Sequence, residues 1–100
     1  MTLRHVVTWK VAGETDDERE SVKIQFRERL LSLPPQIDVI RSFEVGLNDA
    51  GAADNFDVVL ISEFDDEDAL QQYIQHPVHQ EVVRFVRANT VGRSGVDYEL

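Results

Sequence analysis

The sequence predicts a single α+β domain over residues 1–100, with a four-stranded antiparallel sheet that carries helices on one face. Four segments alternate apolar and other residues with the period of two that is typical of β-strands. Two segments between them repeat apolar residues at helical spacing, every three or four positions. In chain order the six segments are residues 2–11 (strand), 15–33 (helix), 37–47 (strand), 56–64 (strand), 65–86 (helix) and 96–100 (strand).

The first strand, residues 2–11, has one apolar face with a single polar member. The apolar residues of that face are Leu3, Val7, Trp9 and Val11. His5 shares their face, because side chains two positions apart in a strand point to the same side. His5 is therefore either a core histidine with satisfied hydrogen bonds or a group that lines a pocket.

The first helix has a clear start and a clear stop. Residues 15–18, Thr-Asp-Asp-Glu, have the form of a capping box, in which the hydroxyl and the carboxylate each accept a backbone N–H. Pro34 and Pro35 end the helix, because proline lacks the N–H that the helix needs. The apolar stripe between these signals is Val22, Phe26, Leu30 and Leu33.

The second and third strands, residues 37–47 and 56–64, are joined by a loop of glycine, small and acidic residues at 48–55. The centre of the third strand, residues 58–61, is apolar on both faces. Such a strand must be covered on both faces. Asp57 at the entrance of this strand is either a surface carboxylate or a polar group of a pocket.

Pro77 interrupts the second helical segment, residues 65–86, because it removes a helix hydrogen bond and restrains the residue before it. Tyr73, His76 and His79 lie around this break, which makes the segment a candidate site. Each residue also has a structural explanation: Tyr73 as a core aromatic, His76 as a capping residue, and His79 as a buried hydrogen-bonding group.

Residues 89–95 are predicted to be a loop, and residues 96–100 a short last strand. The resulting order β-α-β-β-α-β is that of a ferredoxin-like domain. Such a sheet leaves one face uncovered in a monomer, and that face would hold Val6, Thr8 and one side of residues 58–61. Exposed apolar patches usually mark interfaces. We therefore expect a homodimer with the sheets face to face.

Composition excludes several classes of protein. The formal net charge of −9 disfavours binding to nucleic acid or to anionic membranes. The chain has no cysteine, which excludes disulfides, thiol catalysis and thiolate metal sites. The sequence has no apolar run long enough for a membrane span and no secretory signal, so we expect a cytoplasmic protein. No phosphate-binding loop, nucleophile elbow or convincing metal site is present, and we expect no cofactor.

Three segments resemble the stress-responsive A/B barrel (Dabb) family: His-Val-Val-Thr-Trp-Lys at residues 5–10, Tyr-Ile-Gln-His-Pro-Val-His at 73–79, and Val-Asp-Tyr-Glu at 96–99. The resemblance covers essentially the whole chain and implies a dimeric α+β barrel. Most members have no assigned activity, while a plant branch cyclises linear polyketides by an aldol-type reaction without a cofactor.

The resemblance to the plant branch implies roles for individual residues. His79 matches its general base and Tyr73 its hydrogen-bond donor to the developing charge. The residues expected to contact a substrate are His5, Val7, Trp9, Asp57, Val59 and His76. The plant branch has a histidine where this chain has Asp57 and a smaller aliphatic residue where it has Trp9. A compact or charged ligand would suit these changes better than a long-tailed polyketide.

Three functions follow as hypotheses. The first is a small-molecule-binding protein or a cyclase- or isomerase-like enzyme that uses His79, Tyr73 and His5. The second is a non-catalytic stress-related dimer in which these residues serve packing. The third, by analogy of fold alone, is a cofactor-free monooxygenase.

Overall fold

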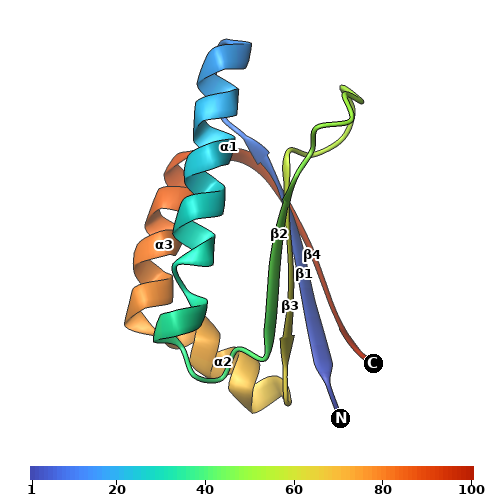
Figure 1. The fold of residues 1–100 in the computed structure, drawn as a ribbon, viewed down its shortest axis with the longest axis vertical. Coiled ribbons are helices and arrows are strands. Elements are labelled where there is room, and N and C mark those ends of the chain that lie inside the picture. The colour runs from blue at the N-terminus through green and yellow to red at the C-terminus, as the bar shows by residue number, and fades with distance from the viewer.

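The computed structural model describes residues 1–100 and contains the predicted strand and helix order, with the second helical segment divided in two. The elements are β1 (Leu3–Val11), α1 (Asp16–Leu31), a 3₁₀ turn (Pro34–Gln36), β2 (Ser42–Leu47), β3 (Val58–Phe64), α2 (Glu67–Gln75), α3 (Pro77–Ala88) and β4 (Thr90–Glu99). The four strands form one antiparallel sheet in the order β2-β3-β1-β4. All helices lie on one face of it (Figure 1). The predicted ferredoxin-like α+β fold is confirmed.

The core lies between the sheet and the helices. Along β1 every odd-numbered residue from Leu3 to Val11 is buried and every even-numbered one is half-buried, as the alternation of the sequence predicts. His5 is buried with its apolar neighbours. The helices and β3 complete the core with Phe26, Leu30, Leu33, Val58, Leu60, Phe64, Leu70, Tyr73 and Val82.

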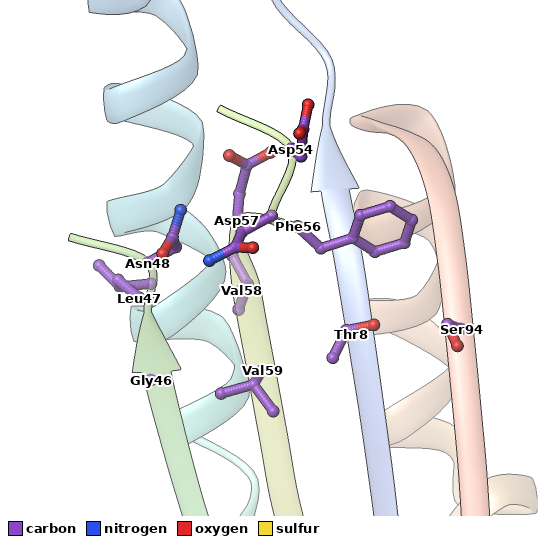
Figure 2. Close-up of a pocket in the computed structure, with 11 residues that line it drawn as sticks. Thr8, Gly46, Leu47, Asn48, Asp54, Phe56, Asp57, Val58, Val59 and Ser94 are labelled. Carbon is purple, nitrogen blue, oxygen red and sulfur yellow. The ribbon is translucent and has the colours of Figure 1, made fainter. Parts of the chain in front are cut away.

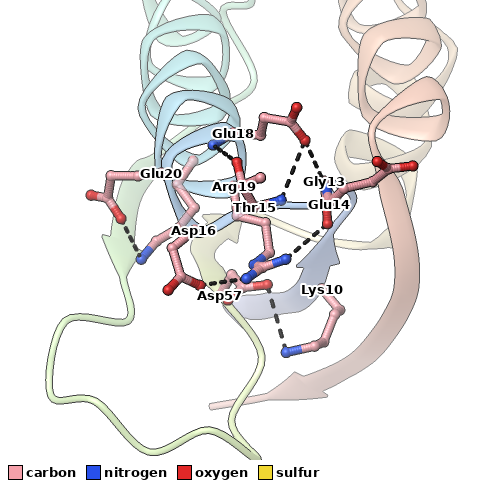
Figure 3. Close-up of polar contacts among 10 residues, drawn as sticks. Lys10, Gly13, Glu14, Thr15, Asp16, Glu18, Arg19, Glu20 and Asp57 are labelled. Atoms are coloured by element: carbon pink, nitrogen blue, oxygen red, sulfur yellow. Dashed lines mark hydrogen bonds and ion pairs between the residues drawn. The ribbon is translucent and has the colours of Figure 1, made fainter.

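The capping box at the start of α1 is present as predicted (Figure 3). The Glu18 N–H donates to the Thr15 hydroxyl at 3.1 Å, and the Thr15 N–H donates to the Glu18 carboxylate at 3.4 Å. These contacts satisfy backbone donors that no helix carbonyl can reach.

The predicted break at Pro77 separates α2 from α3. His76 between them has an extended backbone (φ −63°, ψ 134°) and is at once the last cap of α2 and the first cap of α3. Its Nδ1 accepts the N–H of Val78 at 3.2 Å. Pro77 occupies the first helical position of α3, where its missing N–H costs nothing.

Two strand boundaries were predicted wrongly. Strand β2 begins at Ser42 and not at residue 37, because the 3₁₀ turn places Ile37 in the core before the chain reaches the sheet edge. Strand β4 begins at Thr90, so the predicted loop at residues 89–95 is wrong. Its glycines and serine disfavour a strand in isolation, but the long edge of β1 pairs with them, from Val11 with Thr90 to Leu3 with Glu99.

The second face of the sheet carries no helix (Figure 1). Val6, Thr8, Val59 and Ile61 are half-buried there. The edge strand β4 adds Val96 and Tyr98, which are 60% and 41% exposed. Apolar side chains therefore form a connected surface over three strands. None of the helices combines the length and the apolarity that crossing a bilayer requires.

Candidate functional site

A cavity of about 400 Å³ lies on the helix-bearing face of the sheet, bordered by β1, β4, α2 and α3. This volume is within the range of small-molecule sites. Five of the predicted site residues line it: His5, Val7, Trp9, Tyr73 and His79. The alternation of β1 directs His5, Val7 and Trp9 to the cavity side of the sheet, and the break at Pro77 places Tyr73 and His79 beside it.

The break brings Tyr73 and His79 together. Tyr73 lies in the last turns of α2 and His79 in the first turn of α3, and their ring centroids are 4.3 Å apart. Tyr73 is 1% exposed and packs against the rings of Phe64 and Phe43. Its ring is held on three sides, so its hydroxyl has little freedom to move.

The break also sets the tautomer of His79. Because the Val78 N–H is capped by His76, it does not reach the carbonyl of Ile74 four residues earlier. That carbonyl instead lies 3.0 Å from His79 Nδ1 and accepts a hydrogen bond from the side-chain amide of Gln80 at 2.6 Å. A carbonyl only accepts, so Nδ1 carries the hydrogen and Nε2 of the neutral ring keeps its lone pair.

Burial lowers the pKa of His79 below its ordinary value of 6.5. The charges that His5 and His76 can carry lower it further, while the hydrogen bond to Ile74 opposes the change. His79 is therefore neutral at pH 7, which is the state that a general base needs.

Burial raises the pKa of the Tyr73 hydroxyl well above its ordinary value of 10.0, so this group stays protonated and can donate. No fully buried polar side-chain atom lacks a partner. The Tyr73 hydroxyl makes no hydrogen bond within the chain and is not completely enclosed, and Tyr73 is among the residues that line the cavity. A donor and a base thus stand side by side at one wall.

Asp97 is a residue of the site that the sequence reading missed. The Nδ1–H of His5 donates to Asp97 Oδ1 at 2.5 Å, between directly paired residues of β1 and β4. This contact orients the His5 ring and leaves Nε2 on its other side. The sequence did not indicate this contact, because the predicted last strand of five residues, 96–100, is too short to define its register with β1.

Three predicted site residues do not line this cavity. Val59 lies on the helix-free face, because its neighbours Val58 and Leu60 are the residues that face the helices. His76 uses its ring to cap α3. Asp57 accepts the N–H of Val11 at 2.9 Å and lies 4.0 Å from the Lys10 ammonium (Figure 3). Its carboxylate holds the start of β3 against the end of β1.

Asp57 and Val59 border a different hollow, of about 600 Å³, on the helix-free face. Figure 2 shows it at the ends of β2 and β3, with the ring of Phe56 lying across β1 toward β4. It is wide and open to solvent. It contains no histidine or tyrosine, so it lacks the acid–base groups of the first cavity.

Two positively charged residues also line the first cavity, Arg87 from the end of α3 and Arg93 from β4. The sequence reading assigned Arg93 to a loop and so missed it. No group of three or more histidine or acidic side chains is close enough to hold a metal ion.

The fold and the cavity define a class of protein: small ferredoxin-like α+β domains in which a histidine and a tyrosine from two consecutive helices meet at the break between them. Within it, the chain matches the family model of the Stress Responsive A/B Barrel Domain (Dabb) over residues 3–100. It belongs to that family, which confirms the resemblance seen in the sequence.

Individual relatives agree. The chain is 31% identical over 78 residues to an uncharacterised protein of Streptomyces coelicolor, covering 78% of this chain and 79% of that one. It is 33% identical to a dimeric protein of unknown function and ferredoxin-like fold from Bacteroides fragilis, covering 99% and 96% of the chains with a TM-score of 0.89. A Dabb family protein from Mesorhizobium loti shares the fold at 22% identity, with coverage of 99% and 96% and a TM-score of 0.74.

Proposed function

We propose that this chain works as a cytoplasmic homodimer that binds a small aromatic or polyketide-like molecule beside Tyr73 and His79 and transfers protons on it. The observation that carries the proposal is the pairing of a neutral base with a protonated donor at the wall of one cavity. The hydrogen bond to Ile74, which leaves His79 Nε2 available, supports this reading.

The proposed reaction needs no cofactor. His79 Nε2 takes a proton from a CH₂ between two carbonyl groups, and Tyr73 donates a hydrogen bond to the carbonyl oxygen on which the charge develops. The resulting carbanion attacks a second carbonyl of the same molecule, and the new alkoxide takes back the proton from His79. Atoms and charges balance within one substrate, while the Ile74 carbonyl stabilises the transient imidazolium.

Trp9 supports a compact substrate. Its side chain is 6% exposed and stands edge-on to Phe26, with ring centroids 5.7 Å apart. Because the Trp9 ring fills space between the sheet and α1, it shortens the cavity on that side. This favours a ligand of one or two rings over one with a long tail.

The dimer is supported by the helix-free face of the sheet. An apolar surface that spans three strands is a common kind of self-association site. The Bacteroides fragilis protein, which covers almost all of this chain in the comparison, is described as dimeric.

A ligand screen with paired variants tests the function. Purified protein is scanned by thermal shift against aromatic, polyketide-like and quinol compounds, and hits are followed by calorimetry and turnover assays. A ligand at a hundred times its dissociation constant adds about 2.7 kcal/mol to the free energy of unfolding. His79→Ala and Tyr73→Phe should remain folded and lose the response.

Tyr98→Phe is the matched control, since it removes the same hydroxyl from the helix-free face of β4. Normal ligand binding by Tyr73→Phe and His79→Ala would contradict the proposal. So would the absence of any hit combined with strong destabilisation by both substitutions. That outcome would indicate that the two rings serve packing alone.

A further inference from the structure

Arg93 lies on the cavity side of β4. It pairs with Trp9 across the ladder, and directly paired residues share a face of the sheet. Its guanidinium runs along the strand over Gly95: Nη1 and Nη2 lie 3.3 Å and 3.5 Å from the position that a Cβ at Gly95 would occupy. Gly95, which pairs with Val7, leaves room for this charge at the wall of the cavity.

Arg93 has no partner within the chain. Five other cations of this acidic protein form ion pairs: Arg4, Lys10, Arg19, Lys23 and Arg41. Arg93 is an exposed residue of β4 that forms no ion pair and donates no hydrogen bond. The same holds for Arg27, Arg29, Arg84 and Arg87, but of these only Arg87 also lines the cavity. Asp97, the nearer of the two acidic residues on the same face of β4, is held by His5. All five N–H donors of the guanidinium therefore remain available.

We propose that the ligand of this cavity carries a carboxylate, which Arg93 binds through both arms of its guanidinium. This inference rests on the proposed function, because it concerns the same cavity. The guanidinium fork matches the two oxygens of a carboxylate, and such charge-assisted pairs are stronger than neutral hydrogen bonds.

The rest of the wall suits the body of such a ligand. Nine of the fourteen lining residues are hydrophobic, and no acidic residue is among them. A planar apolar group can extend from Arg93 past Val7 and Trp9. The reacting end then faces Tyr73 and His79. Arg93 thus acts as a positioning residue that decides which end of the ligand meets the base. Arg87, an exposed residue of α3 at the same cavity, adds positive potential.

Matched ligand pairs test the carboxylate. Benzoate, salicylate and 2-naphthoate are compared with benzamide, salicylamide and 2-naphthamide by calorimetry, which keeps shape nearly constant and removes the charge. Wild-type protein should bind the acids about tenfold to a hundredfold more tightly than the amides. Added salt should weaken only the acids.

Variants assign the preference to Arg93. Arg93→Gln should bring acids and amides to nearly equal affinity without changing the affinity for the amides, and Arg93→Lys should restore part of the difference. Arg84→Gln is the matched control, because Arg84 is an exposed arginine of α3 outside the cavity. It should keep the full preference.

Equal binding of acids and amides by wild-type protein would overturn the carboxylate assignment, as would a preference that survives in Arg93→Gln. If His79→Ala and Tyr73→Phe still abolished binding in that case, the proposed function would stand, but its ligand would not need a carboxylate. If neither acids nor amides bound at all, both proposals would fall together.

Discussion

The chemistry proposed for His79 depends on a single backbone group, the carbonyl of Ile74. In an unbroken helix this carbonyl would accept the N–H of Val78. The cap at His76 takes that N–H, so the carbonyl accepts from side chains and holds the imidazole in one tautomer. A proline two residues away thereby determines which nitrogen of His79 is basic.

The lowered pKa of His79 predicts a pH dependence of stability. At a pH between the pKa of His79 in the folded chain and its value of 6.5 in the unfolded chain, the unfolded chain binds more protons. The contribution of His79 to the free energy of unfolding is therefore fully present above pH 6.5 and is lost as the pH falls below it. His79→Gln should remove this part of the slope. Urea denaturation of both proteins from pH 7.5 to pH 5 measures it. Identical slopes would show that His79 titrates in the folded state as in the unfolded one.

At the level of elements, the junction between α2 and α3 positions two residues of the candidate site. Two residues of this junction act on both helices. Pro77 ends α2 and begins α3, and His76 caps both. The same break directs Tyr73 and His79 into one cavity. The sequence predicted the break and the three residues, and it offered both capping and ligand contact for His76, of which the structure shows the cap of α3.

The cap predicts a stability effect without a binding effect. His76→Ala removes the acceptor of the Val78 N–H and should cost about 1 kcal/mol. His76→Asn, which keeps a side-chain acceptor, should lose much less. Thermal and urea unfolding measure both. A loss of ligand affinity in His76→Ala with unchanged stability would instead show that His76 contacts the ligand, as the sequence reading expected.

At the level of the whole molecule, the two faces of the sheet differ in what covers them. One face carries the helices and the cavity lined by Tyr73 and His79, while the other exposes apolar side chains of β1, β3 and β4. Because a strand alternates, β1 contributes to both at once: His5 and Trp9 to the cavity, Val6 and Thr8 to the open face.

The open face predicts how the proposed dimer can be broken. Val96→Lys places a charge on the exposed edge strand of this face and should give a folded monomer in native mass spectrometry and sedimentation at micromolar concentration. Leu31→Lys, an equivalent change at an exposed site of α1, should leave the dimer intact. A wild-type chain that remains monomeric, or a Val96→Lys chain that remains dimeric, would rule out this interface.

Local patterns in the sequence determined the order of the elements, the capped start of α1, the break at Pro77 and the placement of His5 on the apolar face of its strand. These depend on periodicity and on backbone chemistry, which act between near neighbours, while the likeness to the Dabb family rests on three short segments. The tertiary structure decided the length of β4, the pairing of Asp97 with His5, the place of Arg93 on the cavity wall, and the departure of Val59, Asp57 and His76 from it. Each depends on strand register or on a contact between distant segments, and pairing with β1 overrides the weak strand preference of residues 90–95.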